Sequence, residues 1–147
     1  MSVAIAVGAA CLVASGCGGG ERELSAQQLV EEFNAHAASG VALELEEKLI
    51  VSGEAAAGEV FALALETPES DAAEAEGDGD DHAGSGSVVV LEGSEEALVE
   101  FSRCEGAIDF ACYRAANVVL RFEGLAPVGQ SQVAQTLQAL SDSASTR

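Results

Sequence analysis

The sequence predicts an α+β fold in a single domain, with a mixed, mainly antiparallel sheet and about three helices. Three observations support this prediction: capping residues that precede apolar residues at helical spacing, short segments that alternate with period two, and one continuous apolar run. The expected order is helix, strand, strand, acidic loop, strand, helix, strand, strand, helix, within residues 24–141. Helices packed on a sheet can bury all of these apolar faces in one core.

A first helix is expected to begin after Ser25. Ser25 and Gln28 have the spacing of a capping box, in which each side chain accepts a hydrogen bond from the backbone of the other. Leu24 and Leu29 occupy the positions of a hydrophobic staple around this box. Gly40 is expected to cap the end of the helix, because glycine readily adopts the left-handed conformation. The expected apolar face contains Ala26, Leu29, Val30, Phe33 and Ala37.

Two alternating segments predict a first pair of strands. Residues 41–46 alternate between apolar and mostly acidic side chains, and residues 59–66 alternate again. Residues 49–51 are apolar and predict a second short strand or a loop that packs inward. Residues 52–58, rich in Ala and Gly, are expected to form a connection.

Residues 67–87 are predicted to form a disordered acidic loop inside the domain. They contain many acidic residues, no basic residue and too little apolar surface to offset the entropy of ordering. Asp78, Asp80 and His82 are weak candidates for a cation site, since ligands at alternate positions resemble those of calcium loops. The EF-hand pattern fails at its turn glycine and at its final Glu. A solvated acidic loop is therefore the preferred interpretation, and no metal site is assigned.

The next two elements are a central strand and a second helix. Residues 88–91 are continuously apolar, which is typical of a strand covered on both faces. Ser94 is expected to cap the helix, with Glu95 and Glu96 at the positive end of its dipole and Arg103 at the other end. The helix is expected to end at Cys104-Glu105-Gly106, and its expected buried residues are Ala97, Leu98 and Phe101.

The C-terminal part predicts a hairpin and a third helix. Residues 108–114 and 117–123 read as strands around Ala115-Ala116, and Gly124 and Pro127 are expected to stop the second strand. Residues 142–147 are expected to be a frayed polar tail. The shared strand face contains Val118, Leu120 and Phe122, and the helix face contains Val133, Leu137 and Leu140.

The start of the chain has the features of an export signal. Residues 1–16 contain no charged side chain, and their apolar run is shorter than the about 20 residues of a membrane-spanning helix. Ala14-Ser15-Gly16-Cys17 resembles the lipobox of bacterial lipoproteins. The resemblance implies that residues 1–16 are a removed signal peptide and that the Cys17 thiol carries a diacylglyceryl anchor at the extracytoplasmic face of the cell membrane. Residues 17–23 would then form a lipid-anchored, glycine-rich tether.

One feature departs from the pattern of a signal peptide, since no Lys or Arg follows Met1. Either the α-amine alone supplies the positive charge, or the true start lies upstream of Met1. Ala14 and Gly16 are also small enough for a plain secretory signal, which exports the chain without an anchor.

Export would place Cys104 and Cys112 in a compartment where disulfides form. Cys11 lies within the signal, so Cys104 and Cys112 form an even pair in an oxidising compartment. We therefore predict a disulfide between them. A free thiol pair or metal ligands are the alternatives, although no CxxC motif or nearby His accompanies them.

The formal net charge of −19, with 6 basic and 25 acidic residues, restricts the possible partners. Nucleic acids and anionic lipid headgroups are excluded as partners of the folded body, because both require clustered Lys and Arg. A partner held by charge would have to be cationic, such as a metal ion, a basic peptide or a polyamine. The preferred interpretation is that acidity keeps an exported protein soluble. Without a catalytic motif, we expect a non-catalytic binding module without cofactor, whose partner is an envelope protein or a small ligand. The alternatives are an enzyme that uses acidic residues and a weak divalent-cation-binding protein.

Overall fold

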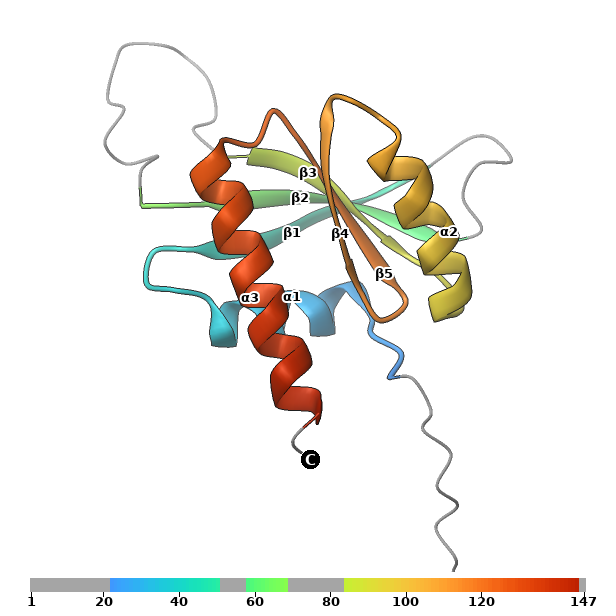
Figure 1. Cartoon of the computed structure of the whole chain (residues 1–147), viewed down its shortest axis with the longest axis horizontal. Coiled ribbons are helices and arrows are strands. Elements are labelled where there is room, and N and C mark those ends of the chain that lie inside the picture. Colours follow the sequence, from blue (N-terminus) through green and yellow to red (C-terminus); the bar gives the residue numbers. More distant parts are fainter. Residues whose placement is uncertain (1–21, 51–57, 69–83, 146–147) are drawn as a thin grey trace, which may run out of the picture.

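The computed structural model describes residues 22–50, 58–68 and 84–145 (Figure 1). These residues form one α+β fold, and the order of their elements confirms the expected order of helices and strands. The helices are α1 (Ala26–His36), α2 (Ser94–Glu105) and α3 (Pro127–Ser145). The strands are β1 (Ala42–Leu49), β2 (Glu59–Glu66), β3 (Gly84–Val90), β4 (Phe110–Ala115) and β5 (Val118–Glu123).

The five strands form one sheet in the order β1-β2-β3-β5-β4. Every neighbouring pair is antiparallel, so the described sheet is fully antiparallel and not mixed. The chain leaves β3, passes through α2 and returns as β4, and β5 then fills the position between β3 and β4. This order, which the sequence analysis did not predict, makes β1 and β4 the two edge strands.

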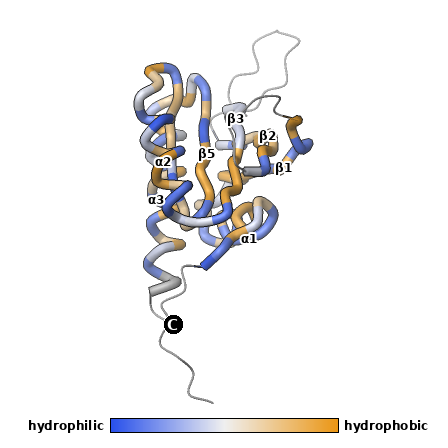
Figure 2. Tube along the Cα trace, turned by 90° about the vertical axis from the view of Figure 1, so that its right-hand side faces the viewer, coloured by the Kyte–Doolittle hydropathy of each residue, from blue (hydrophilic) through white to orange (hydrophobic). Residues whose placement is uncertain are grey.

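The helices cover both faces of the sheet. α1 and α3 pack on each other and on one face, whereas α2 packs on the other face against β4 and β5. Strands β2, β3 and β5 carry long hydrophobic stretches between these layers (Figure 2). Val88 and Val89 lie in opposite cores, which confirms that β3 is a central strand covered on both faces. Val118, Leu120 and Phe122 share the α1–α3 core, as the period-two pattern predicts.

The capping box of α1 is confirmed, and the expected C-cap is wrong. The Gln28 N–H donates to Ser25 Oγ at 3.2 Å, and the Ser25 N–H donates to Gln28 Oε1 at 3.0 Å. The helix ends at His36 with Ala37 as its C-cap. Gly40, with φ +82°, instead lies in the turn to β1, where a Cβ would approach the Pro68 side chain to 2.8 Å.

The strands differ from the expected ones at their ends. β1 extends to Leu49, and Ile50 is 94% exposed, so the expected inward packing of this apolar segment is wrong for these two residues. A register shift between Leu45 and Lys48 interrupts the alternation that would have turned the segment inward.

The expected acidic loop is shorter than residues 67–87. Residues 84–87 belong to β3 and pair with β2, because ladder hydrogen bonds need no apolar side chains. At Gly86 a Cβ would lie 2.2 Å from the Arg121 carbonyl oxygen, so the absence of a side chain permits this pairing. Residues 69–83 lie outside the described residues.

The start and the buried face of α2 also need correction. Gly93 is the N-cap, and Ser94 is the first helical residue. Leu98 is 52% exposed, whereas Glu100 is buried. The face toward the sheet therefore follows helical spacing from Ala97 through Cys104, and one of its positions is a carboxylate that the sheet pairs with an arginine.

The C-terminal hairpin and helix are confirmed with shifted bounds. β4 begins at Phe110, and Ile108 is 99% exposed, so the first hairpin strand is shorter than expected. The turn consists of Ala116, with φ 52°, and Asn117. Pro127 begins α3, and its missing N–H removes no hydrogen bond there, because the first N–H groups of a helix have no partner within the helix. The helix runs to Ser145, beyond the expected start of the polar tail at residue 142.

Candidate functional site

The outer edge of β4 is the feature around which the candidate site is built. The Leu91 N–H donates to the Asn117 carbonyl oxygen at 2.9 Å, so the Asn117 carbonyl points toward the β3 side of β5. Backbone groups alternate in direction along an antiparallel strand, so those of Val118 and every second residue after it point toward β4. Their register partners in β4 are Ala115, Tyr113 and Ala111.

The other three residues of β4 therefore direct their backbone groups away from the sheet. These residues are Phe110, Cys112 and Arg114. No described strand pairs with this edge. Unpaired N–H and C=O groups on an edge strand are able to bind another extended chain.

A cavity of about 600 Å³ opens along this edge. We call it the β4 groove. Consecutive residues of β4 and the following turn form one side, α3 forms another, and the segment before α1 closes it. Most of the lining side chains are apolar. They are Arg22, Leu24, Glu32, Phe101, Cys112, Tyr113, Arg114, Ala115, Ala116, Ala134, Leu137, Gln138, Leu140 and Ser141.

Tyr113 fixes the position of α3 beside the groove. Its hydroxyl donates to the Gln130 carbonyl oxygen of α3 at 3.1 Å. Its ring lies edge-on to Phe122, with centroids 6.3 Å apart. Burial raises the pKa of Tyr113 above its ordinary value, because the phenolate would lose hydration. Tyr113 is therefore neutral at physiological pH, and its ring presents an apolar surface to the groove.

Arg114 is the free positive charge of the groove. The other described basic residues, Arg22, Lys48, Arg103 and Arg121, each pair with a carboxylate. Arg114 is exposed, and no carboxylate among the described residues lies within ion-pair distance of it. In so acidic a chain, an unpaired guanidinium beside an apolar groove favours a ligand that carries a negative charge.

Asn117 holds the segment that closes the groove. The Leu24 N–H donates to Asn117 Oδ1 at 2.7 Å, and Asn117 Nδ2 donates to the carbonyl oxygens of Leu24 at 3.2 Å and Leu91 at 2.9 Å. At the rim, the Arg22 guanidinium pairs with Glu32 of α1. From the sequence, Asn117 was expected only near a turn. This role was not predicted, because the partners of Asn117 are distant in sequence.

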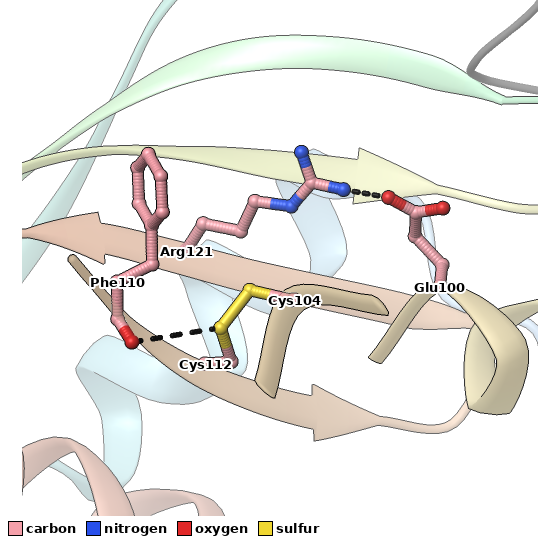
Figure 3. Close-up of a disulfide and its surroundings, with 5 residues drawn as sticks. All are labelled: Glu100, Cys104, Phe110, Cys112 and Arg121. Atoms are coloured by element: carbon pink, nitrogen blue, oxygen red, sulfur yellow. Dashed lines mark hydrogen bonds and ion pairs between the residues drawn. A yellow bond between two sulfur atoms is a disulfide. The ribbon is translucent and has the colours of Figure 1, made fainter. Parts of the chain in front are cut away.

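Cys104 of α2 and Cys112 of β4 are bonded in the structure, as the sequence analysis predicts (Figure 3). Their Cα atoms are 6.0 Å apart, within the usual range for a disulfide. Cys112 Sγ also lies 3.8 Å from the Phe110 carbonyl oxygen. This contact is not a hydrogen bond, because a disulfide sulfur carries no hydrogen. The bond ties the edge strand to α2 and gives the groove one fixed side.

Glu100 forms a second link between α2 and the sheet. Its buried carboxylate pairs with Arg121 of β5 (Figure 3). The same carboxylate lies 3.4 Å from Arg103 Nη1. Burial lowers the pKa of Arg121. A carboxylate held by two guanidinium groups is suited to docking α2 on the sheet. The pair was not predicted, because the sequence alone suggests that Glu100 faces solvent.

The other predicted site residues lie outside the described residues. These are Cys17, the predicted lipidation site, and the weak cation candidates Asp78, Asp80 and His82. Across residues 22–50, 58–68 and 84–145, no group of three or more His, Cys, Asp and Glu side chains is placed to hold a metal ion. In the same ranges, no helix has both the length and the hydrophobicity of a membrane span.

Comparisons with protein-family models, with curated proteins and with solved structures give no match. The geometry of the β4 groove is therefore the basis for assigning a function.

Proposed function

We propose that this chain is a lipid-anchored exported protein of the cell envelope, whose single domain is a non-catalytic binding module. The β4 groove is the proposed ligand site, and it is the observation that carries the proposal. A concave, mostly apolar cavity with a few directed polar groups is the usual form of a ligand site. Here the polar groups are the guanidinium of Arg114 and the outward backbone groups of the edge strand.

The position of the groove supports a role close to a membrane. Arg22 and Leu24 line the groove, and Arg22 lies five residues after Cys17 in the sequence. Five residues extend by at most about 18 Å. A lipid on Cys17 would therefore keep the groove within a short distance of the bilayer, where an envelope protein or a small envelope ligand can reach it.

The scarcity of carboxylates in the described lining of the groove favours binding over catalysis. An enzyme that uses acidic residues would need carboxylates that face one pocket without permanent partners. Among the described residues, Glu32 is the one acidic residue that lines the β4 groove, and Arg22 pairs with it. Glu100, buried elsewhere, is paired with arginines.

Mass spectrometry of the native protein tests the anchor. We expect residues 1–16 to be absent and Cys17 to carry a diacylglyceryl group. Cys17→Ser is expected to leave the membrane fraction, whereas the control Cys11→Ser is expected to be processed and anchored normally. A native protein that retains residues 1–16, or carries an unmodified thiol at Cys17, would contradict the anchor.

Filling the groove tests its role in binding. Ala134 and Ala139 are both exposed on α3, and Ala134 lines the groove whereas Ala139 does not. Ala134→Trp is expected to abolish the capture of envelope components by the purified protein, and the matched control Ala139→Trp is expected to retain it. Both variants should keep the thermal midpoint of the wild type. Equal capture by all three proteins would show that ligands bind elsewhere.

A further inference from the structure

We infer that the β4 groove binds an extended peptide segment, which adds to the sheet along the outer edge of β4 and places an acidic side chain against Arg114. This inference rests on the proposed function and names the class of ligand. Three properties of the edge carry it: the direction of its backbone groups, the side chains on its two sides, and its charge.

The backbone of β4 specifies an extended partner. Phe110, Cys112 and Arg114 present N–H and C=O groups outward at every second residue, a repeat of about 6.8 Å. Another strand presents complementary groups at the same repeat, which is the basis of peptide binding by strand addition. A small amphiphile would fill the apolar cavity but leave these backbone groups without a matching partner.

The side chains of the groove differ on the two sides of β4. Tyr113 and Ala115 lie on the side of α3, together with Leu137 and Leu140. Arg114 lies on the opposite side, since neighbouring residues of a strand point to opposite faces. A bound strand would therefore direct apolar side chains toward α3 and an acidic side chain, at a position between them, toward Arg114.

The net charge of the chain favours a foreign peptide as the partner of the β4 edge over a second copy of this chain. Pairing two β4 edges would bring together two bodies of net charge −19 and would place two unpaired Arg114 side chains at one interface. A short peptide with a single carboxylate avoids most of the repulsion and neutralises Arg114.

Selection of random short peptides displayed on phage tests this inference, with the full chain, as the cell processes it, as target. We expect selected peptides to share one Asp or Glu flanked by apolar residues. A synthetic peptide of this sequence should slow hydrogen exchange at the outward amides of Cys112 and Arg114. The amides of Tyr113 and Ala115, already directed at β5, provide the internal control.

Substitutions at Arg114 separate its charge from its backbone group. Arg114→Gln is expected to weaken binding of the synthetic peptide about fivefold. Arg114→Pro also removes the outward N–H, which the β4–β5 ladder does not use, and is expected to weaken binding by about a further tenfold. Arg103→Gln removes an arginine outside the groove and should bind as the wild type does. If Arg114→Pro unfolds, Arg114→Gln and the exchange experiment still decide the question.

The possible failures have different meanings. Peptide binding that leaves the exchange of Cys112 and Arg114 unchanged would overturn strand addition. Failure to select any peptide, combined with binding of palmitate that Ala134→Trp blocks, would overturn the peptide ligand and leave the proposed function standing. If neither peptides nor palmitate bind in a manner that Ala134→Trp blocks, both proposals fail. A dimer in light scattering that Arg114→Pro dissociates would assign the edge to a second copy.

Discussion

Asn117 joins three parts of the chain through one buried side chain. Its amide accepts a hydrogen bond from the Leu24 N–H and donates to the Leu24 and Leu91 carbonyl oxygens, so it connects the entry of α1, the exit of β3 and the hairpin turn. Each of these backbone groups would otherwise lack a partner away from water, which costs more than a hydrogen bond contributes. Asn117 therefore has a larger structural role than its position in a turn suggests.

Asn117→Ala is expected to lower the free energy of unfolding by about 3 kcal/mol, because it leaves the Leu24 N–H and two carbonyl groups unpaired. Urea denaturation checks this value. Gln138→Ala, at an exposed position of α3, is the control and is expected to change the free energy by less than about 0.5 kcal/mol. Equal effects of the two substitutions would show that the segment before α1 is not held by this side chain.

The burial of Tyr113 at the groove can be measured directly by its ultraviolet absorbance, because it is the one tyrosine of a chain without tryptophan. Desolvation raises its pKa above the ordinary value of 10.0. We expect ultraviolet titration of the folded protein to give a midpoint above 10.0 and titration in denaturant to give the ordinary value.

The raised pKa of Tyr113 also makes stability depend on pH. The folded state holds the phenol proton more tightly than the unfolded chain, so this contribution is complete below pH 10 and is lost as pH rises through the folded pKa. Tyr113→Phe is expected to remove this part of the alkaline loss of stability. A folded midpoint at the ordinary value would contradict the burial of the ring.

At the scale of elements, α2 is held on the sheet by a covalent bond and an ion pair. The Cys104–Cys112 bond fixes the C-terminal end of the helix to β4, and Glu100 pairs with Arg121 of β5. The first link could be predicted, because two cysteines in an exported chain are an explicit signal. The second link could not, because nothing near Glu100 in the sequence indicates that an arginine faces it.

The double substitution Cys104→Ser and Cys112→Ser is expected to lower the free energy of unfolding by about 2–3 kcal/mol, since the short closed loop no longer restricts the unfolded chain. Chemical denaturation under non-reducing conditions measures it. Reduction of the wild type should produce the same loss, and reduction of the double variant should change nothing. A wild type whose stability does not respond to reduction would contradict the bond.

Glu100→Ala is expected to cost about 3 kcal/mol, because it leaves the half-buried Arg121 without its carboxylate. Replacing both residues by leucine should recover most of this loss, since two apolar side chains need no partner. Thermal denaturation of the single and double variants measures the difference. A double variant that is less stable than Glu100→Ala would indicate that the site depends on charge and not on packing.

At the scale of the whole molecule, charge opposes the compact state. The chain carries a net charge of −19, and two of the four ion pairs of the described residues, Arg22–Glu32 and Lys48–Glu59, are exposed and contribute little. Self-repulsion therefore dominates the electrostatic free energy of folding.

Added salt is expected to raise the thermal midpoint of the protein, because screening weakens repulsion among carboxylates more than it weakens the few ion pairs. Sodium chloride and potassium chloride should have the same effect, which excludes binding of one particular cation. A midpoint that falls with salt would show that the ion pairs outweigh the repulsion.

The order of the helices and strands, the capping box of α1, the faces of β3 and β5 and the cysteine pair could all be predicted from the residues. These features depend on spacings of a few residues, where geometry along one helix or strand decides which side chains share a face. The strand order, the edge position of β4, the partners of Asn117 and Glu100, and the β4 groove came from the folded arrangement alone. Each of these joins residues far apart in the chain, and the free energy of such contacts depends on how whole elements pack, which no local pattern records.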